Sequence, residues 1–415
     1  MKVTYCIPML FICFQAYSQD FAKIKVSSGE SDRLECPVGI NLDQINYNEG
    51  KGTIQLFELE GKREVPVPSQ LESGHPAILW FILSGETPRG TSREFILRRS
   101  EVFRVPPRIK LQRRPGQLRL SSMNRPLLDY QFKTVFPPEG INPLFKRSGF
   151  IHPLWSPDGQ ILTRIQPPDH YHHYGIWGPW TKTHINGREV DFWNLLSGQG
   201  TVQFSGFLSQ VEGPVFGGFK ALQQHIDFGA RGADQVAINE VLDVRAWNIG
   251  NGEVYLIDYT TTLNTPLDSG ILLNAYRYGG GIGFRANELW HKDNCTVLTS
   301  ENKDRLSADG TKAKWCIVEG ESLSDKGRSG ILFMGHSSNR EFPEPMRVWP
   351  VDQNNGRGDM FFEFCPIRHN DWLLENGRDY CLRYRLLVFD GSLSPEEAEI
   401  YWQGFANPPR IDLVE

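Results

Sequence analysis

The 415-residue sequence lacks an excess of basic charge. Its 44 Lys and Arg residues stand against 49 Asp and Glu residues, which gives a formal net charge of −5. Proteins that hold nucleic acids usually neutralise phosphates with a surplus of basic side chains, so we expect no nucleic-acid partner. The sequence also lacks an apolar run of about 20 residues, the length needed to cross a bilayer as a helix. We therefore expect no transmembrane segment.

Several motifs of well-known chemistry are missing as well. No C-x-x-C spacing of a zinc or redox site, no P-loop and no dinucleotide-type G-x-G-x-x-G after a strand is present. Two of the seven cysteines fall in the first 18 residues, so an odd number remains. Disulfides between Cys295 and Cys316, or between Cys365 and Cys381, are compatible with the spacing, and buried free thiols are equally compatible.

The first 18 residues have the pattern of a secretory signal. They carry one charge, at Lys2, followed by an apolar stretch over residues 7–14 and by Ala16-Tyr17-Ser18, a small-x-small cleavage site. This apolar stretch is too short to span a bilayer. We expect residues 1–18 to be a signal peptide, and the mature protein to be periplasmic or secreted.

The remaining sequence contains many β-type segments separated by Gly, Pro and Ser. Short runs over residues 53–59, 77–83 and 93–97 predict a small N-terminal β domain over residues 19–107, which ends at a Pro-Pro pair. Longer runs over residues 235–241, 253–263 and 380–389 predict a large antiparallel β-sandwich over residues 108–415. Ser394, Pro395 and Glu397 predict a capped C-terminal helix. The expected fold class is all-β.

The densest group of reactive side chains lies between Pro167 and Gly178. Three of the ten histidines, His170, His172 and His173, follow Asp169 within four positions. An extended segment would place His170 and His172 on one face. Neutral imidazoles can transfer protons, stabilise charge or bind a metal, so these four residues are the candidate catalytic residues. Structural hydrogen bonding of the rings is the alternative.

Further polar and aromatic residues are candidates for holding a ligand. His152 precedes a Pro-Asp-Gly turn, Trp177 follows the histidines, and one Arg stands between two tyrosines. A Pro-stiffened loop near residue 340 adds an imidazole, an amide and a guanidinium, which can bond to sugar hydroxyls. The candidate substrate-binding residues are therefore His152, Trp177, Arg277, His336, Asn339 and Arg340. Turn formation and cation–π packing are the alternatives for them.

The segments HPLWSPDGQILT and DHYHHYGIWG, within Arg147 to Trp177, resemble the PmoA-like family, a domain family of unknown function labelled "methane oxygenase PmoA". The resemblance extends from about Ile109 to Pro409. A subunit of a membrane methane oxygenase would need several apolar spans, so we reject the methane activity. The resemblance instead implies an exported β-sandwich protein of the kind found among carbohydrate-degradation proteins, with the supersandwich form of galactose mutarotase-like proteins.

Three classes of function fit these observations, each with a carbohydrate as ligand. The first is an exported carbohydrate-active enzyme without a cofactor, in which the histidines assist hydrolysis, elimination or epimerisation. The second is an enzyme that uses a divalent metal held by His170 and His172 together with a carboxylate or His336. The third is a non-catalytic glycan-binding protein. The sequence leaves the glycan, its linkage and the oligomeric state open.

Overall fold

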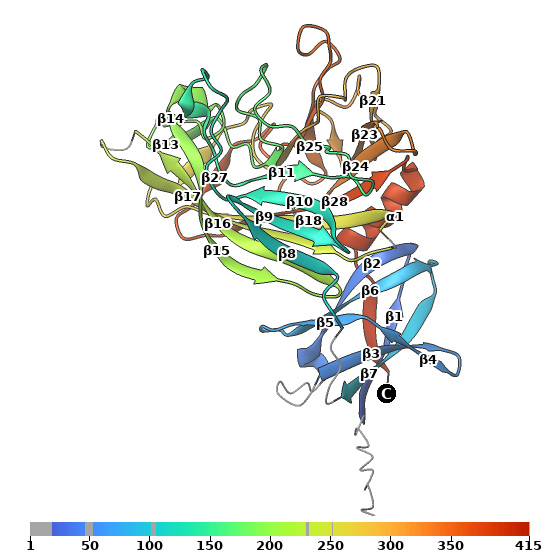
Figure 1. The fold of residues 1–415 in the computed structure, drawn as a ribbon. Helices are drawn as coiled ribbons and strands as arrows, with labels where there is room; N and C mark the ends of the chain where they lie inside the picture. The colour runs from blue at the N-terminus through green and yellow to red at the C-terminus, as the bar shows by residue number, and fades with distance from the viewer. Residues whose placement is uncertain (1–18, 46–52, 101–104, 230–231, 251, 415) are drawn as a thin grey trace, which may run out of the picture.

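The computed structural model describes residues 19–45, 53–100, 105–229, 232–250 and 252–414 (Figure 1). Within these ranges the chain forms antiparallel sheets and a single α-helix near its C-terminal end, which confirms the all-β fold class. No helix in these ranges is long and apolar enough to cross a membrane. The expected signal peptide, residues 1–18, lies outside the described residues.

The first part of the chain forms a small sandwich of two sheets, at the bottom of Figure 1. Alternating apolar residues of both sheets meet in one core, where the rings of Phe81 and Phe95 lie 5.1 Å apart. One sheet has the order β2 (Arg33–Asn41), β6 (Ile78–Thr87), β5 (Ser69–Glu72), and the other has the order β29 (Arg410–Val414), β1 (Gln19–Ser27), β7 (Ser92–Ser100), β3 (Thr53–Glu60), β4 (Arg63–Val67).

The C-terminal strand belongs to this small sandwich. β29 pairs antiparallel with β1, from Ser27 opposite Arg410 to Lys23 opposite Val414. Figure 1 shows this red strand beside the blue strands of the chain's beginning. The expected unit 19–107 therefore shares a sheet with residues 410–414, and the boundary near residue 107 stays a prediction.

The helix α1 (Pro395–Ala406) connects the two parts of the molecule. The Ser394 side chain accepts from the Glu397 N–H and the Glu397 side chain accepts from the Ser394 N–H, so the predicted capping box is confirmed. On one side, the Arg33 guanidinium donates to the Gln403 carbonyl oxygen. On the other side, Trp402 Nε1 donates to the carbonyl oxygen of Gly335. The helix thus packs between the small sandwich and the large one.

Two large sheets make up the second part of the molecule, and their inner faces share one core. The rings of Tyr130 and Phe219 lie 4.6 Å apart across it, and those of Phe333 and Phe362 lie 4.7 Å apart. The nine-stranded sheet has the order β22 (Lys312–Ala313), β25 (Glu344–Val348), β26 (Phe361–Phe364), β20 (Ile282–Arg285), β12 (Ile176–Trp177), β11 (Phe150–Leu154), β10 (Arg125–Gln131), β9 (Gln117–Ser122), β8 (Ile109–Arg114).

The eight-stranded sheet is buried on both faces over its central strands. Val244 and Leu386 face the core between the large sheets, whereas Trp247 and Leu387 face α1 and the small sandwich. This alternation explains the nearly continuous apolar runs that predicted long strands. The sheet has the order β15 (Gly200–Val211), β16 (Phe216–Asp227), β17 (Gln235–Trp247), β18 (Val254–Asn264), β28 (Tyr380–Asp390), β24 (Arg328–Gly335), β23 (Trp315–Glu321), β21 (Cys295–Thr299).

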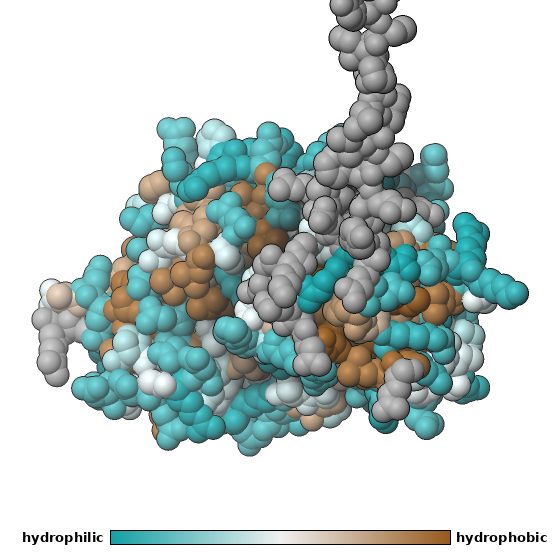
Figure 2. Space-filling view, turned by 90° about the horizontal axis from the view of Figure 1, so that it is seen from below, coloured by the Kyte–Doolittle hydropathy of each residue, from teal (hydrophilic) through white to brown (hydrophobic). Residues whose placement is uncertain are grey.

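Shorter elements complete the large part. A four-stranded sheet has the order β14 (Arg188–Val190), β13 (Thr183–Ile185), β19 (Ile271–Leu273), β27 (Trp372–Leu374). The 3-10 helices are η1 (Leu42–Ile45) in the small sandwich, with η2 (Pro143–Phe145) and η3 (Leu195–Ser197) in the large part. Seen from below, the surface carries separate hydrophobic groups among hydrophilic ones (Figure 2).

The five cysteines within the described residues are free thiols. Cys295 lies opposite Gly320 and Cys316 lies opposite Thr299, so the register of β21 and β23 keeps these two residues apart. Cys365 is buried and bonds weakly to carbonyl oxygens, whereas Cys381 is exposed. The spacing was compatible with disulfides and with free thiols, and the structure contains free thiols at these positions.

Candidate active site

The candidate histidines lie on a tight loop, which we call the histidine loop (Pro167–His173). The loop is not extended, so the face-sharing that an extended segment would give does not apply. The His170 N–H donates to the Pro167 carbonyl oxygen and the His173 N–H donates to that of His170, which are the bonds of two consecutive turns. The Gln166 N–H closes the loop on the His173 carbonyl oxygen. The turns bring all three imidazoles to one side.

A glycine fixes the exit of this loop into β12. Gly175 has a φ of +66°, and a Cβ atom there would lie 2.3 Å from the Ile151 carbonyl oxygen of β11. Only glycine avoids both the left-handed strain and this collision. The neighbouring strand β20 joins through the Arg285 N–H, which donates to the Gly175 carbonyl oxygen. The loop is therefore anchored to the nine-stranded sheet.

The three imidazoles form a cluster. The ring centroids are 5.3 Å apart for His170 and His172, 4.8 Å for His170 and His173, and 4.9 Å for His172 and His173. One nitrogen of each ring lies within 4.8 Å of the others. His170 is 27% exposed and His172 is partly exposed, whereas His173 is 1% exposed. The cluster thus extends from the surface into the protein.

Aromatic rings from distant parts of the chain surround the cluster. Trp193 stacks on His173 with centroids 5.6 Å apart, and its Nε1 donates to the His172 carbonyl oxygen. Trp349 lies 4.8 Å from the ring of His170, and Phe361 lies 5.1 Å from that of His173. Burial of these rings fixes the positions of the imidazoles and lowers the polarity around them.

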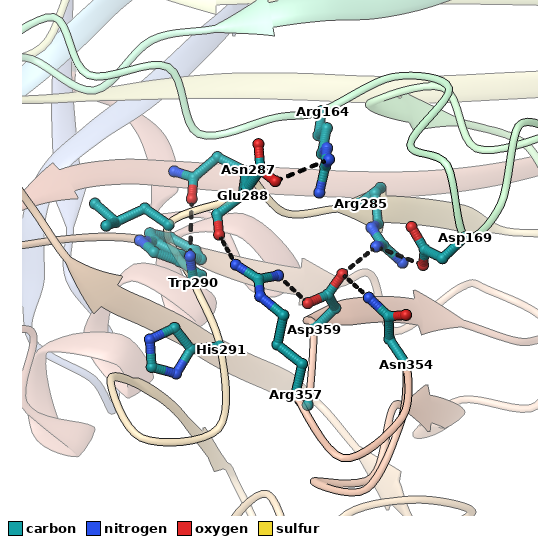
Figure 3. Close-up of polar contacts among 12 residues, drawn as sticks. Arg164, Asp169, Arg285, Asn287, Glu288, Trp290, His291, Asn354, Arg357 and Asp359 are labelled. Atoms are coloured by element: carbon teal, nitrogen blue, oxygen red, sulfur yellow. Dashed lines mark hydrogen bonds and ion pairs between the residues drawn. The ribbon is translucent and has the colours of Figure 1, made fainter.

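An ion-pair network holds the loop from the side (Figure 3). The Arg285 Nη2 donates to Asp169 Oδ2 at 2.8 Å and to Asp359 Oδ2 at 2.7 Å. Asp359 also accepts from Asn354 and from Arg357. Asp169 Oδ2 accepts in addition from His170 Nδ1 at 2.9 Å. Asp169 therefore links the network to the imidazole cluster.

The protonation states of the cluster follow from these contacts. Burial disfavours the charge of Asp169, but the bond from His170 and the charge of Arg285 outweigh it and lower its pKa to about 2. An ionised Asp169 only accepts, so His170 donates an Nδ1 proton to it. Burial, and next the charge of His170, lower the pKa of His172 to about 4. Burial also lowers the pKa of His173 well below its usual range.

Two further sequence candidates, Trp177 and His152, lie on the paired strands β12 and β11. Trp177 is 0% exposed, its ring lies 5.4 Å from that of His173, and it supports this imidazole from within. His152 on β11 bonds through Nδ1 to the Thr163 hydroxyl, and burial lowers its pKa to about 4. In this structure, Trp177 has no face open to a sugar.

Arg277 connects to the cluster through aromatic rings. Its exposed guanidinium lies 5.3 Å from the centroid of Tyr278, and the Tyr278 ring lies 5.2 Å from that of Trp193. The Tyr278 hydroxyl accepts from Trp349 Nε1. The cation–π alternative for Arg277 is present with Tyr278, and the ring of Tyr276 lies 5.9 Å from that of Tyr278.

The loop from His336 to Arg340 lies elsewhere, beside α1 and the end of β28. His336 contacts the ring of Phe405, and Asn339 donates to the buried carboxyl of Glu344. Arg340 donates to the Asp371 carbonyl oxygen and lies over Trp372. Among the described residues, no hydrogen bond, ion pair or ring contact joins this loop to the histidines, so its expected role in the same site stays a prediction.

Residues that sequence reasoning missed complete the site. Arg285 ends a strand, Asp359 precedes one, and Trp349 follows one, so nothing in their local sequence distinguishes them. Trp193 is preceded by Asp191, whose carboxylate accepts from the backbone N–H groups of Trp193 and Asn194. This Asp-x-x-Asn turn was the one local signal available.

Comparison with known families places the chain. The model of a family described as "Family of unknown function (DUF6807)" matches residues 117–403. The chain belongs to this family. The histidine loop, Arg285 and Asp359 all lie within the DUF6807 region, whereas the small sandwich lies outside it. The label PmoA-like stays a prediction. No curated protein matches the sequence.

Solved structures similar to this DUF6807 chain include carbohydrate enzymes. An alpha-mannosidase from Enterococcus faecalis V583 has 10% identity and a TM-score of 0.43, over 97% of this chain and 46% of its own. A GH36 alpha-galactosidase from Geobacillus stearothermophilus has 11% identity and a TM-score of 0.32, over 69% of this chain and 41% of its own. A galactose mutarotase related enzyme from Lactobacillus acidophilus has 8% identity and a TM-score of 0.31, over 69% of this chain and 100% of its own. The chain thus spans less than half of the mannosidase.

Proposed function

We propose that this protein is a carbohydrate-active enzyme whose reaction centre is the cluster of His170, His172 and His173. One observation carries the proposal: three imidazoles converge at a partly exposed position, and all three contacts between their rings are about 5 Å. Purely structural histidines would be expected to have their ring nitrogens bonded to protein groups. Among the described residues, no hydrogen bond is made by the ring of His172.

The arrangement around His170 favours chemistry over packing. Asp169 accepts from Nδ1 and so fixes the ring orientation and the tautomer, as an orienting carboxylate does in hydrolytic triads. Arg285, which is 1% exposed, holds Asp169 in turn. This chain of bonds leaves the Nε2 atom of His170 outside the contact with Asp169, and an imidazole nitrogen oriented in this way can take part in proton transfer.

A ligand platform lies beside the cluster. Tyr276 and Tyr278 are partly exposed, and Arg277 between them is exposed. Aromatic faces stack on the apolar faces of sugars, and a guanidinium donates to hydroxyls or a carboxylate. Hydrolysis, elimination and epimerisation all require a proton to move at such a site. Product analysis distinguishes these three reactions.

Product analysis of a panel of poly- and oligosaccharides tests the proposal. Wild-type protein and the variants His170→Ala and His369→Gln would be incubated with each sugar and the products separated by chromatography. His369 is exposed and lies outside the cluster, so its variant is a matched control. We expect product from wild type and control, and about 10²–10⁴-fold less from His170→Ala. No product from wild type on any sugar would refute catalysis, and glycan binding without product would favour the non-catalytic alternative.

We also propose that the enzyme acts outside the cytoplasm, in the periplasm or as a secreted protein. The proposal rests on the signal-like pattern of residues 1–18. N-terminal sequencing of protein recovered from its native compartment is expected to begin directly after Ser18. A mature protein that retains Met1 would contradict it.

A further inference from the structure

The three imidazoles also have the composition of a metal site. Neutral imidazole suits Zn²⁺, Cu²⁺, Fe²⁺ and Ni²⁺, and three histidine ligands with one open position occur in catalytic zinc centres. One nitrogen of each ring lies within 4.8 Å of the others. Zn–N bonds of about 2.0–2.1 Å in a tetrahedron require nitrogen atoms about 3.3 Å apart. The rings therefore need to approach by about 1.5 Å, and the ring of His172, which is partly exposed and makes no hydrogen bond within the described residues, can move toward the other two.

A buried polar atom points to the same conclusion. His173 is 1% exposed, and its Nδ1 is buried without a hydrogen-bond partner. Such an atom loses its hydration on folding and gains nothing in return, a loss that a bound ligand would remove. Its ring is held on several sides by Trp177, Trp193 and Phe361. Packing therefore holds the His173 ring in place, and a ligand has to bind it in its present orientation.

The position of Asp169 is also compatible with a metal site. Metal-binding histidines usually donate their other N–H to a carboxylate, which orients the ring and makes it a better ligand. Asp169 accepts from His170 Nδ1 at 2.9 Å, which leaves Nε2 for an ion. Arg285 is balanced by Asp169 and Asp359, and Arg357 also pairs with Asp359, so two positive and two negative charges cancel beside the cluster. An added cation would meet no net positive charge from this network.

We propose that His170, His172 and His173 are the protein ligands of one divalent transition-metal ion, with Asp169 orienting His170 from outside the ligand set. The inference rests on the proposed function only for the substrate, a carbohydrate bound beside the ion. The ion uses the lone pairs of the rings, so it would act as a Lewis acid that polarises a sugar oxygen or acidifies a bound water. Asp169 and the buried rings remain positioning residues.

Direct binding of Zn²⁺ to the full-length protein, without any sugar, tests the inference. Chelator-treated wild type, His172→Ala, Asp169→Asn and His369→Gln would be titrated calorimetrically with Zn²⁺. We expect one ion per chain for wild type and His369→Gln. Asp169→Asn should bind about 10–100-fold more weakly, as for loss of an outer partner, and His172→Ala should lose still more. Far-UV circular dichroism shows which variants are folded.

The outcomes separate this inference from the proposed function. No binding by wild type, or equal binding by folded wild type and His172→Ala, would overturn the metal site, even if sugars are converted. Binding that depends on His172, together with no product from any sugar, would support the metal site and refute the carbohydrate reaction. If His172→Ala fails to fold, folded Asp169→Asn with unchanged affinity overturns the inference instead.

Discussion

Replacing Arg285 by methionine should destabilise the protein and disorganise the histidine loop together. The Arg285 side chain is 1% exposed and pairs with both Asp169 and Asp359. After the substitution, Asp359 keeps Arg357 and Asn354, whereas Asp169 keeps only His170. Methionine has a similar length and leaves little cavity, so the main effect is a buried carboxylate without its cation.

The size of the effect follows from burial. Removing one partner of a buried ion pair costs about 3–5 kcal/mol. Part of this can be traced to Asp169, whose pKa, despite burial, is lowered from 3.8 to about 2 by the bond from His170 and next by the charge of Arg285. The whole shift contributes roughly 1–2 kcal/mol at neutral pH once solvent screening is allowed for, and Arg285 supplies a share of it. Because the folded-state pKa is the lower one, this contribution is present above pH 3.8 and is lost as the pH falls through about 2.

Urea unfolding followed by tryptophan fluorescence measures the loss. At pH 7 we expect Arg285→Met to be less stable than wild type by about 3–5 kcal/mol, and the difference to narrow between pH 4 and pH 2. Arg357→Met is the control, since its side chain is 37% exposed and Asp359 retains Arg285. A loss below about 1 kcal/mol, or a difference independent of pH, would refute this account of the network.

Two other substitutions test the fold. Burial raises the pKa of Glu344 from 4.5 to about 8, so the free energy of unfolding of wild type should fall by up to about 5 kcal/mol as the pH rises between these values. The free energy of unfolding of Glu344→Gln should stay constant over the same range. Thermal midpoints of the two proteins that run parallel from pH 5 to 8 would contradict this. Gly175→Ala should lower the free energy of unfolding by more than about 2 kcal/mol, because it adds a collision with Ile151 to the left-handed strain. Gly187→Ala, with open space around it, should lower it by about 1–2 kcal/mol. Equal unfolding midpoints of the two variants would contradict the collision.

Local signals in the sequence predicted the local structure well. Ser394 and Glu397 form their capping box, and the runs 253–263 and 380–389 became β18 and β28 with small shifts at their ends. The proximity of the three histidines was also readable, because they are neighbours in sequence. Their exact arrangement could not be predicted, since the segment forms two turns in succession and an extended segment was only one possibility.

The partners of the histidines could not be predicted because they come from distant strands. Arg285 reaches Asp169 from β20, and Asp359 reaches Arg285 from the residues before β26. Only the order of strands in the nine-stranded sheet brings these residues together. Trp349 and Phe361 reach the cluster in the same way. Conversely, Asn339 stood in a polar loop typical of ligand sites, yet it donates to the buried carboxyl of Glu344.

The pairing of β29 with β1 has a consequence for biosynthesis. The ribosome makes residues 410–414 only after both large sheets and α1, so the edge of β1 remains unpaired while nearly all of the polypeptide is produced. Unpaired strand edges recruit other chains, and partially made proteins aggregate through them. The first sandwich to emerge is thus among the last to be completed.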